Sequence, residues 1–571
     1  MKPFGPAFRL LEAILILHLL GLSAMDAAAQ TGQASTSVSD SFAVLSEALR
    51  LSRTGRFDDA IATYQSVLQQ DPKSGEAYAG ISRCLLKQEK IADAVDAANK
   101  GVAEAPLSSA AHSALGDVLF RKGEIHEADV EWVKAANAPQ HDARAFLGIS
   151  RMEDAMSLYA QAKKHIDRAH ELDPGDPEIQ RHWLSTRSRA EQVRMLEEYL
   201  ARVGDEDGRT RENLGRRLEL LKAREQQPSR SCKLVSQVNS TETNLERLMI
   251  DPTHLHGYGL RVSVNGQTAR LLLDTGASGL LINRRMAEKA GVQSVIKNTM
   301  QGIGDKGPMT GYVGYADSIK VGGLEFQNCL VEVSDKRSVV DDDGLIGADV
   351  FSSFLVTIDF PKEKLVLSEL PKRPDEQQGK SVSLDTGDPD DPSNGPEDSE
   401  APQKSPDAKE KTDAAPAKSA VTGGPKDRYV APEMRTYTPI YRFGHELLIP
   451  TMIGNNSPKL FLIDTGSLTN LMSSEVAKTV TKVRDDSSMT IRGLSGTVKN
   501  VKSADKVVIQ FAHFRQENDD LIAFDLGGIS RSTGTEVSGI LGFTVLRMLT
   551  MKIDYRDGLV DFEYKPSPWQ R

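Results

Sequence analysis

The sequence predicts a multidomain protein, in which an all-α helical solenoid is followed by two all-β units. Three observations support this prediction. Alanine recurs every 34 residues from Ala60 to Ala162 within a helical pattern. An apolar run that ends in Asp-Thr-Gly occurs at Asp274 and again at Asp464. Residues 371–430, between the two copies, are dominated by Pro, Asp, Glu, Ser, Lys and Ala and contain almost no large apolar residue.

Length and composition restrict the class of protein. A chain of 571 residues is too long for one hydrophobic core and favours about three or four units. The formal net charge is −10 and no basic domain offsets it, which argues against a nucleic-acid partner. Cys84, Cys232 and Cys329 lie far apart without metal-ligand spacing, so we expect no metal and no cofactor. Cys84 is expected in a helix core, and the sequence leaves open whether Cys232 and Cys329 are bridged.

Residues 1–29 have the order of a secretory signal peptide. Lys2 and Arg9 precede the apolar run of residues 10–22, and Ala27-Ala28-Ala29 follows it. The apolar run is shorter than the ~20 residues that span a bilayer. We therefore expect an exported, periplasmic or secreted protein. A membrane association is expected only if this segment is not cleaved, which the sequence does not tell.

Residues 41–175 are expected to form helical repeats. The 34-residue period also places an apolar residue early in each second helix and a proline after its end: Phe57, Ile91, Ile125 and Tyr159, then Pro72, Pro106, Pro139 and Pro174. Gly55 and Gly123 fit the turns within the repeats, whereas the fourth repeat has no glycine in residues 154–157. The pattern resembles the tetratricopeptide repeat, which implies a stacked array with a groove for a protein partner. Residues 176–228 continue as charged helix and are expected to cap the array.

The first β unit is expected over residues 250–370. Two short apolar strands flank Asn265-Gly266, a pair typical of a tight hairpin. After the Asp-Thr-Gly turn, a short helix is expected from Arg284 to Ala290. Nearby, His254 and His256 are interpreted as strand-entry residues and not as metal ligands, because no third ligand accompanies them.

The second β unit repeats this order over residues 438–565. Strands at 447–452 and 459–463 flank a turn, and a short helix is expected at 473–480. The stretch between the units, residues 371–430, is expected to be a disordered linker, because it has too few apolar residues to offset the entropy of folding. Its own Asp-Thr-Gly, at Asp385, follows no buried apolar run and is interpreted as chance. A linker of this length allows the units to pair within one chain, although pairing between two chains stays open.

Three markers align the two β units. They are the acid, a glycine-rich hairpin and an apolar-apolar-glycine sequence: Asp274 with Gly302, Gly304 and Gly347 in the first unit, and Asp464 with Gly493, Gly496 and Gly542 in the second. From the acid to the first hairpin glycine there are 28 residues in one unit and 29 in the other. Two buried carboxylates that face each other share one proton. The charged one can then take a proton from water while the protonated one donates to a carbonyl oxygen.

Both units resemble the active-site region of the aspartic peptidases, and the spacing resembles the retroviral (retropepsin-like) type. The resemblance implies a catalytic dyad of Asp274 and Asp464. It implies support for the dyad from two threonines that cross-link the loops and from nearby small residues: Thr275, Gly276, Ser278, Thr465, Gly466, Gly347 and Gly542. It implies flaps at Gly302, Gly304, Gly493 and Gly496. Ser278 is expected to bond the outer oxygen of Asp274. The second unit has Leu468 at this position, so we expect an asymmetric dyad in which Asp464 lacks one support.

These observations predict an exported aspartic endopeptidase whose repeats recruit a protein substrate or partner. The expected partners are a protein or peptide substrate and a possible protein on the repeat groove, with no nucleic acid, metal or cofactor. The alternative is a non-catalytic interaction scaffold with an inactive protease-like platform. The substrate, the cleavage preference and the pH optimum are not predicted by the sequence.

Overall fold

The computed structural model describes most of the helical array and both β units. The described residues are 41–202, 208–226, 232–249, 251–252, 254–300, 302, 307, 309–336, 342–374, 376, 425–454, 457–486, 491–493, 495–498 and 500–565. The expected signal peptide, most of the expected linker and Gly304 lie outside them. Within the described part of the chain, no helix is both long and apolar enough to cross a membrane.

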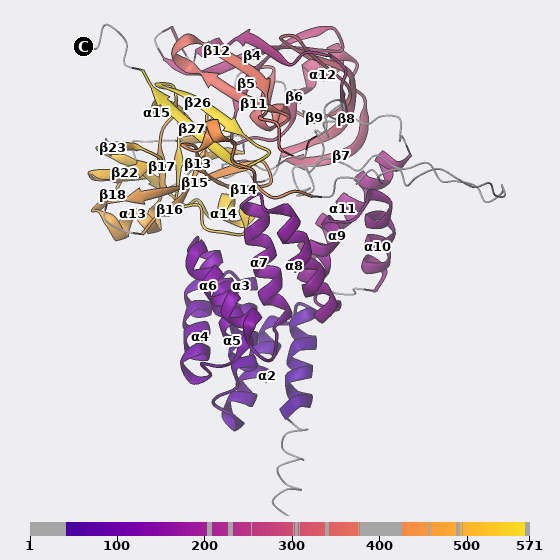
Figure 1. Cartoon of the computed structure of the whole chain (residues 1–571), viewed down its shortest axis with the longest axis vertical. Coiled ribbons are helices and arrows are strands. Elements are labelled where there is room, and N and C mark those ends of the chain that lie inside the picture. Colours follow the sequence, from indigo (N-terminus) through magenta and orange to yellow (C-terminus); the bar gives the residue numbers. More distant parts are fainter. Residues whose placement is uncertain are drawn as a thin grey trace, which may run out of the picture.

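The N-terminal half is an array of paired helices, drawn in indigo and purple in Figure 1. A helix over residues 41–53 is followed by α2 (Phe57–Gln70), α3 (Gly75–Lys87), α4 (Ile91–Glu104), α5 (Ser109–Arg121), α6 (Ile125–Asn137), α7 (Ala143–Ala155) and α8 (Tyr159–Leu172). The helices α9 (Pro177–Ser185), α10 (Arg189–Arg202) and α11 (Gly208–Glu225) extend the array. The predicted order, helical repeats followed by a β-rich region, is confirmed.

The 34-residue period corresponds to one helix pair. Its alanines lie in the second helix of each pair and are at most 1% exposed: Ala60, Ala94, Ala128 and Ala162. The turn inside each pair contains one residue with a positive φ: Gly55, Glu89, Gly123 and Ser157. Ser157, with a φ of 59°, therefore takes the conformation that glycine takes in the first and third repeats. The fourth repeat therefore forms the same turn, although it has serine where the first and third repeats have glycine.

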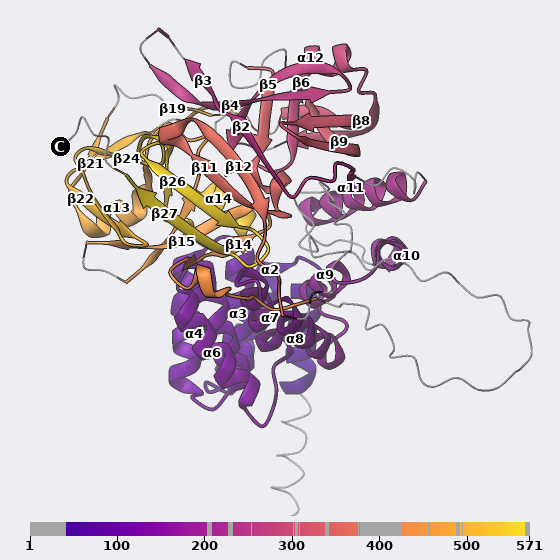
Figure 2. The ribbon, with the colours of Figure 1, turned by 45° about the horizontal axis from the view of Figure 1, so that its top comes forward.

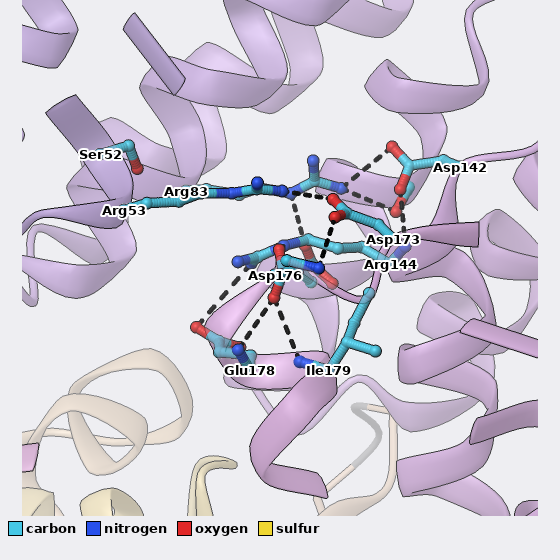
Figure 3. A network of polar contacts seen from close by, with 12 residues as sticks. Ser52, Arg53, Arg83, Asp142, Arg144, Asp173, Asp176, Glu178 and Ile179 are labelled. Atoms are coloured by element: carbon cyan, nitrogen blue, oxygen red, sulfur yellow. Dashed lines mark hydrogen bonds and ion pairs between the residues drawn. The ribbon is translucent and has the colours of Figure 1, made fainter. Parts of the chain in front are cut away.

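Ion pairs link the second, third and fourth repeats and α9 (Figure 3). Arg83 of the second repeat donates to Asp117 of the third at 3.0 Å and to Asp142 of the fourth at 3.3 Å. Arg144 donates to Asp176, the N-cap of α9, at 2.7 Å. Each carboxylate in this group pairs with a guanidinium, so the charges compensate one another where the repeats meet.

Unit 1 is a nine-stranded sheet among the described residues. Its strands are β1 (Lys233–Leu234), β3 (Glu246–Met249), β4 (Leu255–Val264), β5 (Gln267–Asp274), β6 (Leu280–Asn283), β7 (Ser294–Met300), β8 (Met309–Val321), β9 (Leu324–Ser334) and β10 (Gly344–Gly347). The predicted hairpin joins β4 to β5, with Asn265 and Gly266 both at positive φ. The predicted helix is α12 (Arg284–Ala290), which ends at Gly291 in the left-handed conformation.

Unit 2 repeats this arrangement in a ten-stranded sheet of described residues. Its strands are β14 (Tyr441–Phe443), β15 (Glu446–Ile453), β16 (Lys459–Ile463), β17 (Leu471–Ser473), β18 (Val483–Asp485), β21 (Lys502–Ala504), β22 (Val507–Phe511), β23 (Phe514–Asn518), β24 (Leu521–Phe524) and β25 (Gly539–Leu541). The predicted helix is α13 (Ser474–Val480). A separate two-stranded hairpin, β19 (Ile491–Gly493) and β20 (Gly496–Val498), corresponds to the expected flap.

A six-stranded sheet joins the two units (Figure 2). Unit 1 contributes β11 (Phe354–Asp359) and β12 (Lys364–Glu369), preceded in the chain by β2 (Ser240–Asn244). Unit 2 contributes β13 (Thr438–Pro439), β26 (Leu549–Asp554) and β27 (Leu559–Tyr564). The central pairing, β11 with β26, is antiparallel and joins the units within a single chain. Of the cysteines, Cys232 and Cys329 form a disulfide in unit 1, and Cys84 is free and buried.

Candidate active site

Each of the two acids stands at the end of a strand that is buried on both faces. In β5, Leu271 and Leu273 face the main core, and Leu272 faces a smaller cluster. The parallel strand β10 runs beside β5, so that Gly347 lies opposite Asp274. In unit 2, β25 runs parallel to β16 in the same way. The apolar runs thus fix both carboxylates at the interface of the two units.

Two threonines cross-link the acid loops. The Thr275 hydroxyl donates to the Ile463 carbonyl at 2.8 Å and accepts from the Thr465 amide at 3.1 Å. Reciprocally, the Thr465 hydroxyl donates to the Leu273 carbonyl at 2.9 Å and accepts from the Thr275 amide at 3.1 Å. Both threonines are at most 2% exposed. The four buried bonds hold the two loops in a nearly symmetric arrangement.

The glycine after each threonine lets the loops approach. A Cβ on Gly276 would lie 2.8 Å from Cγ of Asp464, and a Cβ on Gly466 would lie 2.6 Å from Cγ of Asp274. Each carboxyl group therefore lies against the backbone of the opposite loop. Gly347 and Gly542 also stand where no side chain fits. A Cβ at either position would lie within 2.5 Å of a backbone oxygen of the acid loop or of the residues just after it.

The environment of the two carboxyls favours one shared proton. Burial and the facing Asp464 carboxylate raise the pKa of Asp274 well above its usual value. Burial also raises the pKa of Asp464, against the opposing effect of the Ser467 amide and the hydrogen bond from Asp274. Asp464 Oδ1 accepts from the amides of Gly466 at 2.9 Å and Ser467 at 3.0 Å. Asp274 Oδ1 accepts from the Gly276 amide at 2.8 Å, and the Gly466 amide also lowers the pKa of Asp274. The dyad is asymmetric, because the Ser467 amide donates to Asp464.

The expectation for Ser278 is wrong. Its hydroxyl donates to Asp349 Oδ2 at 2.9 Å and not to Asp274. Asp349 lies in η1 (Ala348–Phe351), directly after β10, and also accepts from the Gly279 amide at 3.0 Å. Because this carboxylate reaches back to the end of the acid loop, it takes the hydroxyl that was expected at the dyad. Asp349 was missed by the sequence reasoning, although it stands two residues after a marker glycine.

The two flaps meet each other. The Gly302 amide of the first flap donates to the Ser495 hydroxyl of the second at 3.0 Å. Ser495 is 2% exposed and lies between the paired residues Gly493 and Gly496. The sequence reasoning named the glycines but not this serine, whose hydroxyl is the polar contact between the flaps.

Metal ligands do not gather in the described part of the chain, where no three His, Cys, Asp or Glu side chains form a group that could hold an ion. His254 lies at a strand entry and contacts Asp251 at 2.7 Å.

Comparison with known proteins agrees with this geometry. Residues 260–350 match the family model described as aspartyl protease, and residues 51–118 match that of the tetratricopeptide repeat. This chain carries an aspartyl protease domain together with tetratricopeptide repeats. The protease match spans the first acid loop, the first flap and Gly347, all within unit 1.

One curated protein and one solved structure are similar to parts of this chain. The DNA damage-inducible protein 1 of Chaetomium globosum is 29% identical over 115 residues, which is 20% of this chain and 25% of that protein. This chain therefore spans about a quarter of that relative's length. The crystal structure of an aspartic proteinase from Irpex lacteus covers 57% of this chain and 97% of its own, with 13% identity and a TM-score of 0.32.

Proposed function

We propose that this protein is an exported aspartic endopeptidase with one active site, formed by Asp274 of unit 1 and Asp464 of unit 2. The observation that carries the proposal is the reciprocal threonine bonding, which brings two buried carboxyls with raised pKa values together. Burial of two acids at such a junction costs free energy that a purely structural site would avoid. A catalytic dyad, in contrast, requires two carboxyl groups close enough to share one proton.

The uneven amide donors support a division of roles. The Ser467 amide and the hydrogen bond from Asp274 favour the charged form of Asp464, which acts as the general base, and Asp274 holds the shared proton. A water molecule between them loses a proton to Asp464 as its oxygen bonds to the peptide carbonyl carbon. Asp274 donates its proton to the carbonyl oxygen, which gives a neutral tetrahedral diol. Asp464 then protonates the leaving nitrogen, the C–N bond breaks, and one diol hydroxyl returns its proton to Asp274.

Export and substrate recruitment are further parts of the proposal. The Cys232–Cys329 disulfide supports an oxidising compartment, in agreement with the signal-like order of residues 1–29. Thiol trapping of the protein from cells should leave these two cysteines unmodified without reductant. The repeats are proposed to hold a protein substrate or partner beside the protease units, as other helical repeat arrays hold their ligands.

The decisive experiment is cleavage of an unstructured protein, such as denatured casein, between pH 3 and pH 8 with and without pepstatin. Wild type is compared with Asp274→Asn and Asp464→Asn. Loss of cleavage in both variants, with an unchanged circular dichroism spectrum, supports one shared site. Full activity in either variant would contradict the proposal. A wild-type chain that binds peptides stably without cutting them would favour the interaction scaffold.

A further inference from the structure

The two halves of the candidate site differ in the elements that pack against the strands carrying the acids. In unit 1, one face of β5, β6 and β10 packs against the flap strands β7 and β8. The residues of this face and of the flap form a separate apolar cluster, together with one residue of β3: Leu272, Leu281, Leu345, Met300, Met309 and Leu248. We call the three leucines of β5, β6 and β10 the flap-facing wall of unit 1. This wall is backed by β3, a strand of the same unit.

The corresponding wall of unit 2 is part of a larger cluster. Its residues stand at the same offsets from the acid and from the last glycine: Leu462, Leu471 and Ile540. The flap residues Ile491 and Val498 pack against the cluster that contains these wall residues, as the two methionines belong to the cluster of unit 1. The cluster then continues into the third and fourth repeats, which contribute Phe120, Ile125, Ala128, Trp132, Ala135, Ala145, Ile149 and Met152. The strand that corresponds to β3 is β14, and its Tyr441 and Phe443 pack against this cluster. The helices are an additional layer, for which the described cores of unit 1 have no counterpart.

Polar contacts fix the loop that leads to β25. The Thr535 hydroxyl donates to the Phe120 carbonyl at 2.6 Å, and the Thr535 side chain is fully buried. At the next residue, the Glu536 carbonyl lies 3.0 Å from the position of a Cβ on Gly123, in the turn of the third repeat. Val537 is fully buried in the shared cluster. The third repeat thus holds the segment from which the unit 2 wall begins.

The fourth repeat is fixed to unit 2 as well. Asp427 accepts from the backbone amides of Ala160 and Gln161, at 2.9 and 3.1 Å, at the start of α8. Arg442 of β14 donates to the Tyr159 hydroxyl at 3.2 Å. The array lies directly below unit 2 in Figure 1. The third and fourth repeats, which both pair with Arg83 of the second repeat, therefore both contact unit 2 or the segment just before it.

Among the described residues, unit 1 makes no comparable apolar contact with the array. Its described cores contain residues of the β units alone. The helical region meets unit 1 through α11, where Arg216 donates to Thr299 of β7 in an exposed position. A change in the position of the repeats would therefore act on one half of the site.

We propose that the third and fourth repeats determine the side-chain preference of the half-site formed by unit 2. This inference rests on the proposed peptidase function. A peptide crossing the dyad contacts unit 1 on one side of the scissile bond and unit 2 on the other. The repeats shape the wall on the unit 2 side, and a partner that docks on the array changes the preference on that side alone.

The test compares variants on the two sides of the molecule. Thr535→Val removes the bond to the third repeat with little change in volume, and Phe120→Leu reduces the apolar contact. The matched control is Leu248→Ala, which weakens the backing of the unit 1 wall. Cleavage sites in a denatured protein mixture are read by mass spectrometry, position by position. One apolar contact in a pocket is worth about tenfold or more in selectivity, so we expect changes of about that size.

The expected result is a changed preference on one side of the scissile bond for Thr535→Val and Phe120→Leu, and on the opposite side for Leu248→Ala. Equal changes on both sides, or none in either interface variant, would overturn the inference. Hydrogen exchange gives a readout independent of activity. It should rise in Gly539–Leu541 and Ile491–Gly493 for Thr535→Val and stay unchanged in Gly344–Gly347. If wild type does not cleave, the proposed function fails, and unchanged exchange would separately refute the coupling.

Discussion

The threonine cross-link gives the sharpest test of the site. Thr465→Val keeps the shape of the side chain and removes its hydroxyl. The Leu273 carbonyl then loses its donor and the Thr275 amide loses its acceptor. Both groups stay buried, because valine fills the same volume. The mirror variant, Thr275→Val, leaves the Ile463 carbonyl and the Thr465 amide without partners.

The expected cost follows from the number of groups left without a partner. A buried polar group without a hydrogen bond costs about 1–3 kcal/mol, so two of them cost about 2–6 kcal/mol in either variant. Because four bonds of similar length are divided equally between the two hydroxyls, the two variants should be destabilised equally. Thr465→Ser keeps the hydroxyl and serves as the control. Thr465→Ser should lose much less stability than either valine variant.

Local hydrogen exchange is the suitable assay, because a chain with several domains need not unfold in one step. A loss of about 2 kcal/mol or more corresponds to about 30-fold or more faster exchange of the amides in residues 271–276 and 461–466. Peptide cleavage should fall in both valine variants and persist in Thr465→Ser. The reasoning would be refuted if Thr465→Val kept wild-type protection and activity, or if one valine variant were far more damaging than the other.

Three further predictions concern buried acids. The raised pKa of Asp274 means that the folded protein binds its proton more tightly than the unfolded chain, so stability falls as pH rises above about 4; Asp274→Asn should melt at a higher temperature than wild type at pH 7, and the difference should vanish near pH 3. Burial and the neighbouring Asp557 raise the pKa of Asp554 to about 6, so Asp554→Asn should stabilise the protein above pH 6 and not below pH 4, again by thermal melting. Asp557 Oδ1 binds the side chain of Arg373, near the start of the expected linker, and accepts from the amide of Tyr429, near its end, at 2.8 Å. Cutting an inserted protease site within residues 377–424 should therefore leave the halves together on size exclusion, whereas Asp557→Ala should weaken their association. Separation of the wild-type halves would contradict this.

Much of the fold could be predicted because it depends on patterns local in sequence. The 34-residue alanine period predicted the helix pairs, since the small residue is required at every crossing. The paired Asp-Thr-Gly segments predicted which acids meet, since an apolar run with a carboxylate at its end has few stable environments. Asn265-Gly266 predicted its hairpin for a similar reason, because few residues adopt two consecutive positive φ angles. The catalytic role of the acids stays a prediction until cleavage is measured.

The features that were missed depend on contacts between segments far apart in the chain. The position of Ser278 predicted a bond to Asp274, but Asp349, about 70 residues later, competes for the same hydroxyl. The signal for Asp349 was present two residues after Gly347, and its partner could be found only in three dimensions. The Ser495 contact joins residues 193 apart.

The contact between the repeats and unit 2 has the same origin, and it changes how the repeats are understood. The sequence suggested two modules in series, a recruiting array and a peptidase, because the repeat pattern ends well before the first acid. The Thr535–Phe120 bond connects residues 415 apart, and the apolar cluster around it contains the unit 2 wall. An array attached only by a linker could bring a substrate closer. An array that shares a core with one half of the site can also influence which peptide that half accepts.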